Sequence, residues 1–276
     1  MIGGKSILLS AALVALLSAC SQGPTDAEVL QSLGPQEIFQ RAEVQLASDD
    51  PEEAARLFNE VERLYPYSDW AKRALIMAAF SYHTDGDYEN SRAAAQRFID
   101  FYPADEDAAY AQYLLALSYY DQIDQVGRDQ GLTFQALQAL RTVIERYPGS
   151  EYARSSILKF DLAFDHLAAK EMEIGRYYLK RGHYPAAINR FRAVVQDFET
   201  TSHTPEALMR LVEAYLSLGL RDEAQTAGAI LGYNFQSSPF YDDAFKQLTG
   251  QGLDAAPRGT GWLVDIYRRT IRGAWL

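Results

Sequence analysis

The chain has 276 residues, a formal net charge of −11 and 48% hydrophobic residues. The length allows one or two domains, and the hydrophobic share is large enough for a core. The negative charge argues against a nucleic-acid-binding protein, which needs a basic surface. The sequence contains one cysteine, which excludes an internal disulfide, so packing alone must hold the fold together.

Residues 1–19 are typical of a bacterial secretion signal. Lys5 is the only charge in this segment, and an apolar run follows over residues 7–17. That run is shorter than the roughly 20 residues that a membrane-spanning helix needs. Residues 17–20, Leu-Ser-Ala-Cys, match the lipobox of bacterial lipoproteins. We therefore predict cleavage before Cys20 and its conversion to N-palmitoyl, S-diacylglycerol cysteine; the alternative is an ordinary secretion signal with a chance cysteine.

A helical pattern recurs along the rest of the chain. Ala54, Phe58 and Val61 lie at i, i+4 and i+7, and the same spacing begins again at Ala136 and at Ala187. Such positions share one face of an α-helix. Three repeated segments end in Tyr-Pro, at residues 65–66, 102–103 and 147–148, where proline stops a helix. A second helical run with a turn signal precedes each segment, which is typical of tetratricopeptide repeats of roughly 34 residues.

The fold is thus predicted to be all-α, a right-handed tetratricopeptide-repeat superhelix of five helix–turn–helix repeats. Residues 150–182 contain no proline and one glycine, Gly175, before the turn at its end, so they are expected to form a long helix, or two helices meeting near His166. The predicted organisation is a lipidated tether at 20–34, repeats one to three at 35–149, a connecting segment with the first helix of repeat four at 150–182, and the rest of repeats four and five at 183–249.

Residues 250–276 are expected to form a flexible, glycine-rich linker and a basic amphipathic tail. Trp262, Ile266 and Tyr267 lie at helical spacing and are followed by a cluster of arginines. Two interpretations stay open: a capping helix folded onto repeat five, or a segment that docks on a partner or on the membrane surface.

No catalytic centre is predicted. The four histidines, at 83, 166, 183 and 203, lack metal-ligand spacing, and no second cysteine is present to complete a zinc site. The sequence has neither a nucleophile elbow nor a phosphate-binding loop. We therefore expect a protein that is not an enzyme and that has no cofactor and no metal.

Tyrosine is abundant, with 18 copies, and repeat positions explain about half of them. Those not explained lie mostly in the first half, where Tyr67, Trp70, Tyr110 and Tyr113 are candidates for a groove that binds apolar peptide ends. The alternative is plain core packing. Arg190 lies at the edge of the apolar stripe that contains Ala187, and is a candidate partner contact or a solvated arginine.

Several segments resemble the BamD family of outer-membrane protein assembly factors. They are Tyr-Pro-Tyr-Ser-Asp-Trp-Ala at 65–71, Ser-Tyr-Tyr-Asp-Gln-Ile at 118–123, Val-Gly-Arg-Asp-Gln-Gly at 126–131, and residues 167–182 and 185–191. The resemblance covers the lipobox and most of residues 35–245, but not the tail after Gly250.

The resemblance implies a lipid-anchored scaffold of the β-barrel assembly complex on the periplasmic face of the outer membrane. Implied partners are the POTRA domains of BamA, accessory Bam lipoproteins and unfolded outer-membrane β-barrel precursors, with no nucleic acid. Arg190 stands at the place that meets BamA, and the N-terminal repeats are expected to receive the precursors' C-terminal strand. The alternative function is a periplasmic repeat lipoprotein that serves as an adaptor in cell-wall synthesis or division.

Overall fold

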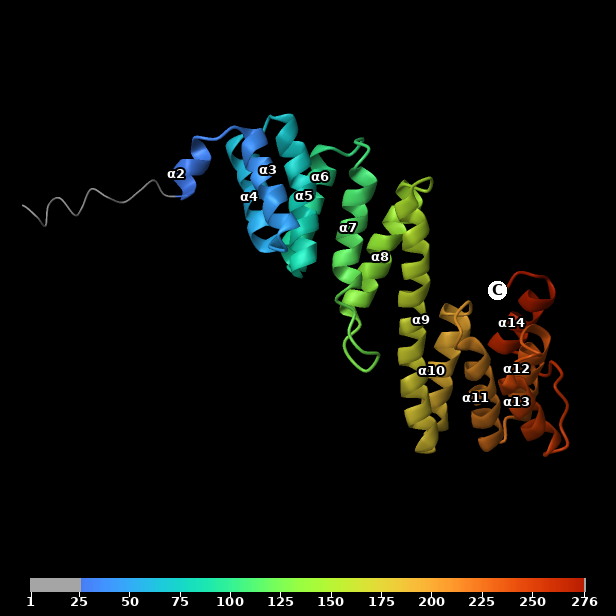
Figure 1. Ribbon diagram of the computed structural model, residues 1–276. Helices are drawn as coiled ribbons and strands as arrows, with labels where there is room; N and C mark the ends of the chain where they lie inside the picture. Colours follow the sequence, from blue (N-terminus) through green and yellow to red (C-terminus); the bar gives the residue numbers. More distant parts are fainter. Residues whose placement is uncertain (1–25, 276) are drawn as a thin grey trace, which may run out of the picture. The chain divides into compact units, whose positions relative to one another are not determined.

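The computed structural model describes residues 26–275, and every regular element in that range is a helix (Figure 1). The chain divides into two compact units, one ending at Leu114 and the other beginning at Leu115. The division falls inside helix α7 (Ala108–Tyr120). Cys20 and the tether as far as residue 25 lie outside the described residues.

The first unit is built from consecutive antiparallel helices. After the short α2 (Asp26–Gln31) come α3 (Pro35–Ala47), α4 (Pro51–Leu64), α5 (Asp69–Asp85), α6 (Tyr88–Phe101) and the beginning of α7. Each of α3 to α5 contacts the next helix in sequence, and α3 also contacts α5. This is the neighbour-on-neighbour packing of stacked helical repeats.

The second unit continues the same scheme with α8 (Gly131–Arg146), α9 (Glu151–Lys180), α10 (Tyr184–Asp197), α11 (Thr204–Ser217), α12 (Arg221–Asn234), α13 (Pro239–Thr249) and α14 (Trp262–Ile271). Each of α8 to α11 contacts the next helix, and α13 and α14 both pack on α12. Taken two at a time in chain order, the ten helices α3 to α12 correspond to the five predicted repeats in residues 26–275, and the all-α, tetratricopeptide-repeat fold is confirmed.

The repeated stripe is the core of each pair. Ala54, Phe58 and Val61 of α4 have no exposed area, and neither do the equivalent residues of α8 and α10. The second helix of each repeat ends one residue before an aromatic C-cap, which is tyrosine in the first three repeats and phenylalanine in the last two. Serine or aspartate caps several N-termini; Ser68 and Ser150, for example, each accept a backbone N–H three residues later at 3.1 Å.

Helix α9 is one continuous helix of 30 residues, about 45 Å long (Figure 1). Near its middle it packs on α8, where Ala163 and Leu167 join Leu137 in a small apolar cluster. Its second half packs on α10, where Ala168 and Met172 join the main core of the unit. One helix therefore packs on both the preceding and the following helix, and no second helix begins at His166.

The tail forms part of the second unit. Leu263, Ile266 and Trp275 are at most 5% exposed and lie in the core cluster with residues of α11 and α12. Of the two interpretations of the tail, this packing favours the capping helix. No helix between residues 26 and 275 is both long enough and apolar enough to cross a bilayer.

Candidate partner-binding surfaces

Arg190 lies on α10 beside the buried stripe, because it follows Ala187 by about one helical turn. Its Nη1 lies 3.1 Å from Oε2 of Glu171 on α9. The Arg190 side chain is still 43% exposed, against 22% for Glu171. An ion pair of this exposure contributes little to stability. The guanidinium is therefore oriented by Glu171 but stays accessible to a partner.

Arg190 and Glu171 line a surface cavity of about 370 Å³ between α9 and α10. Its other lining residues are Tyr178, Ala186, Asn189, Ala193, Asp197 and Phe198. The cavity combines one cation, two carboxylates and two aromatic side chains. Such a mixed lining suits a protein surface with both polar and apolar contacts.

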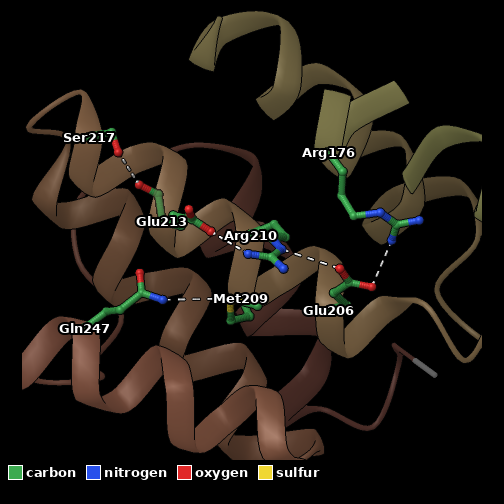
Figure 2. Close-up of polar contacts among 7 residues, drawn as sticks. All are labelled: Arg176, Glu206, Met209, Arg210, Glu213, Ser217 and Gln247. Carbon is green, nitrogen blue, oxygen red and sulfur yellow. Dashed lines mark hydrogen bonds and ion pairs between the residues drawn. The ribbon is translucent and has the colours of Figure 1, made fainter. Parts of the chain in front are cut away.

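A second group of charges joins α9 to α11 (Figure 2). Glu206 lies between two arginines, 3.0 Å from Nη1 of Arg176 and 3.4 Å from Nε of Arg210. Arg210 also donates to Oε2 of Glu213 at 2.8 Å. Burial alone would lower the pKa of Arg210, but the hydrogen bonds and charges of Glu213 and Glu206 outweigh it and raise that pKa. These contacts link α11 to α9, which is one of the two helices that line the Arg190 cavity.

The N-terminal aromatic candidates occupy two places. Tyr67 is fully exposed in the turn before α5, and Trp70 is half-buried in the first turn of that helix. The Trp70 ring centroid lies 5.0 Å from that of Phe39 in α3, and the Arg73 guanidinium lies 4.8 Å from the Trp70 ring. Since Phe39 is only 2% exposed, Trp70 takes part in packing α5 onto α3.

Tyr110 and Tyr113 are half-buried on α7. They lie three residues apart and are therefore neighbours on one helix face. The candidates thus form two pairs, one at the start of α5 and one on α7.

The loop between α6 and α7 is held by an ion pair to α5. Nζ of Lys72 lies 2.7 Å from Oδ2 of Asp105, whose Oδ1 accepts the backbone N–H of Asp107 at 3.0 Å. The hydrogen bond from Lys72 is the largest cause that lowers the pKa of Asp105. The same bond raises the pKa of Lys72.

Some contributors to these surfaces could not be recognised in the sequence. Glu171, which orients Arg190, lies in a run of charged residues with no spacing that marks it. Nζ of Lys170 donates to the carbonyl of Gly127 at 2.7 Å and so ties the loop before α8 to α9. A helical stripe predicts which side chains are buried, but not which exposed charges of different helices meet.

Metal binding has no geometric support among residues 26–275, where no group of three histidine, cysteine or acidic side chains comes together. His203 contacts an acidic side chain: its Nε2 lies 3.2 Å from Oδ2 of Asp165. Asp165 also accepts the Ser202 hydroxyl at 2.7 Å. These contacts tie the α10–α11 loop to α9.

Comparison with known proteins identifies relatives over most of the chain. It is 51% identical over 204 residues to a Caulobacter vibrioides protein, covering 74% of this chain and 67% of that protein. It is 39% identical over 241 residues to a Rickettsia prowazekii protein, covering 87% and 95%. A Neisseria meningitidis serogroup A protein is 30% identical over 255 residues, covering 88% and 96%. All three are named outer membrane protein assembly factor BamD.

Among solved structures, a thermophilic TPR protein of Thermus thermophilus is 19% identical, covering 80% of this chain and 100% of that one, with a TM-score of only 0.36. The family model YfiO, described as outer membrane lipoprotein, matches residues 32–230. The match includes Arg190 and the aromatic candidates and stops before α13 and α14. The chain therefore belongs to the BamD (YfiO) family of outer-membrane lipoproteins.

Proposed function

We propose that this outer-membrane protein assembly factor is a lipid-anchored scaffold that binds BamA and receives unfolded β-barrel precursors. Family membership supports the assembly role, since the curated relatives carry that name. BamA is proposed as the partner because the family resemblance places Arg190 at that contact. The observation that supports it is the Arg190 guanidinium, which stays accessible. Accessory Bam lipoproteins are the further proposed partners.

The anchor is the lipid on Cys20. Membrane attachment through several acyl chains is stable, whereas a single chain binds only marginally. The chain from Cys20 to the first predicted repeat near Pro35 spans a few nanometres at most, at about 3.3 Å per extended residue. The first repeat is therefore proposed to work close to the periplasmic face of the outer membrane.

The proposed action is binding rather than catalysis. In a stacked-repeat protein each helix pair contacts only its neighbours, so a long surface can hold several partners at once. The charges near Arg190 are oriented by ion pairs to α9, which limits the side-chain ordering that a partner must impose. The naming of the relatives as assembly factors supports a scaffold role.

The precursor-binding surface is proposed to include the exposed Tyr67, the edge of Trp70, and Tyr110 and Tyr113 on α7. Tyrosine and tryptophan combine a large apolar area with a polar group and few rotatable bonds, which favours recognition of extended peptides. Trp70 offers less area to a bound peptide than a fully exposed ring would, because one side of it packs on Phe39.

The test of the scaffold proposal is pull-down of BamA by the affinity-tagged, membrane-anchored protein. Arg190→Glu should reduce recovery of BamA at least about tenfold without unfolding the protein, because it places a carboxylate where the partner meets a cation. The matched control is Glu171→Gln. It breaks the same ion pair but leaves the cation in place, so it should retain most of the recovery.

Two results would contradict the proposal. Equal losses in both variants would mean that the ion pair itself, and not contact by Arg190, maintains the surface. Recovery of peptidoglycan synthases in place of BamA would support the adaptor in cell-wall synthesis or division instead. Crosslinking from Tyr113 inside cells tests the precursor surface separately, with β-barrel precursors as the expected product.

A further inference from the structure

A cluster of phenylalanines surrounds a second cavity in the unit that begins at Leu115. The rings of Phe160 and Phe164, one turn apart on α9, stack with centroids 5.9 Å apart. The Phe164 ring lies 4.9 Å from that of Phe198, the C-cap of α10. Phe134 of α8 is 60% exposed beside them. The cavity has a volume of about 350 Å³, and Leu137 and Leu167 complete its apolar lining.

One arginine at this cavity has no counter-ion in the structure. Arg141 lies two helical turns along α8 from Phe134, and its guanidinium carbon lies 5.5 Å from the centroid of the Phe160 ring. It makes no ion pair with any residue from 26 to 275. An accessible guanidinium beside an apolar cavity is suited to a carboxylate that arrives with an apolar group.

The cavity borders the one that contains Arg190. Asp197 and Phe198 line both cavities. Phe134 at the rim of the aromatic cavity is 60% exposed, so the cavity opens to the surface and a bound chain can continue past it. A site that is open in this way favours a segment that passes through it over a chain end that terminates in it.

We propose that this cavity, the phenylalanine groove lined by Phe134, Phe160, Phe164 and Phe198, binds an extended internal segment of a partner protein. The segment places an aromatic side chain among the rings and an acidic side chain at Arg141. In an extended chain, side chains two residues apart lie on one side about 6.6 Å from each other. The Phe160 ring, next to Arg141, and the Phe164 ring have centroids 5.9 Å apart, a similar spacing. The site includes neither the N-terminal aromatic candidates nor Arg190, although it shares Asp197 and Phe198 with the Arg190 cavity.

The test is fluorescence anisotropy of a labelled peptide with the purified mature chain. The probe is fluorescein-Gly-Ser-Glu-Ser-Phe-Ser-Ser-Gly with an amidated C-terminus. Replacing its phenylalanine by alanine, or its glutamate by glutamine, should each weaken binding about tenfold, which corresponds to one desolvated ring or one charge-assisted contact.

Each of the two peptide changes is matched by one variant of the protein. Phe134→Ala should weaken binding of the probe but not of the alanine peptide, and Arg141→Gln should weaken binding of the probe but not of the glutamine peptide. Such non-additivity isolates a direct contact. The matched controls are Tyr233→Ala, which removes an aromatic side chain of similar exposure, 59%, and Arg146→Gln, which removes a cation from the same helix. Both controls should bind the probe as the unchanged protein does.

Several outcomes would overturn the proposal. These are no saturable binding of the probe, equal binding of the probe and the alanine peptide, or additive effects of peptide and protein changes. Tighter binding of a peptide that ends at phenylalanine with a free carboxylate would show that the groove binds a chain end and not an internal segment. A concentration-dependent dimer that Phe134→Ala dissociates in sedimentation would assign the groove to a second copy of the chain.

Discussion

The ring of Phe191 occupies the space that a side chain at Gly175 would need. A Cβ built on Gly175 lies 2.8 Å from Cδ1 and 2.9 Å from Cζ of that ring. Phe191 has no exposed area, so the ring has no solvent to move into. The backbone of α9 therefore approaches α10 as closely as it does only because residue 175 is glycine.

Gly175→Ala should destabilise the second unit by about 1–2 kcal/mol. Alanine in a helix interior gains up to about 1 kcal/mol over glycine. Overpacking a rigid core costs about 1–3 kcal/mol, and at a fully buried ring the upper part of that range applies. Urea unfolding followed by circular dichroism measures the net change.

Gly149→Ala is the matched control for that substitution, because a Cβ at Gly149 meets no atom within 4 Å. Its effect should stay within about 0.5 kcal/mol. A partner variant adds a second check: in a Phe191→Leu background, Gly175→Ala should cost less, because the smaller leucine side chain leaves room for the added methyl group. Additive free energies in this double-mutant cycle would show that the two positions do not clash.

The ion pair between Lys72 and Asp105 predicts a loss of stability in acid. Its hydrogen bond lowers the pKa of Asp105 from the ordinary value of 3.8. A carboxyl group whose pKa is lower in the folded state stabilises fully above its unfolded pKa, and this contribution is lost as the pH falls through the folded pKa. Asp105→Asn should therefore flatten the decline of the urea midpoint below about pH 4.

The neighbouring carboxylate Glu106 supplies the control. It is exposed and makes no ion pair within residues 26–275, so Glu106→Gln should leave the acid slope nearly unchanged. At the alkaline end the sign reverses. The pKa of Lys72 is raised, so its contribution is full below its ordinary value of 10.5 and is lost above that as the pH rises. Equal acid slopes for Asp105→Asn and the unchanged protein would reject the assignment.

Cys20→Ala should release the protein from membranes while the repeats stay folded. The repeats in residues 26–275 have their own buried core of apolar side chains. Fractionation of cells into soluble and membrane parts, in a strain with reduced BamA, measures the attachment. Circular dichroism of the released protein should match that of the unchanged chain. Membrane attachment of the variant that persists without BamA would contradict the lipid anchor.

The repeat stripe was predictable because it is a local property. Ala54, Phe58 and Val61 recur at helical spacing, and each helix pair needs such a stripe to cover its neighbour. For α9 the sequence allows either one helix or two. A helix without proline can still break, and what keeps α9 continuous is burial of successive faces, Leu167 against α8 and Met172 against α10.

The surfaces were harder to predict than the core, for a physical reason. Phe160 and Phe164 have the same i, i+4 spacing as a core stripe, so the sequence cannot reveal that a cavity remains beside them. Trp70 was a candidate for binding peptides, but its contact with Phe39 depends on how α5 meets α3. The predicted boundary between repeat groups near residue 149 stays a prediction.

Two isoleucines in the tail have opposite surroundings, and substituting them tests whether α14 caps the last repeat. Ile266 has no exposed area and packs in the core cluster, whereas Ile271 is 51% exposed. If α14 is a cap, Ile266→Ala should cost about 2–4 kcal/mol, the usual cost of emptying a buried isoleucine site. Ile271→Ala should change the free energy of unfolding by less than about 0.5 kcal/mol.

Comparing Ile266→Ala with Ile271→Ala separates the two interpretations of the tail, because a cap predicts a loss of stability and a docking segment predicts a loss of binding. A cap covers the last repeat and keeps its apolar face from water, as terminal repeats must in a stacked array. Its loss lowers stability in the isolated chain, with no partner present. A tail that only docks elsewhere would leave thermal unfolding of both variants unchanged and would weaken membrane or partner binding instead. Similar effects of the two substitutions on the isolated chain would therefore reject the cap.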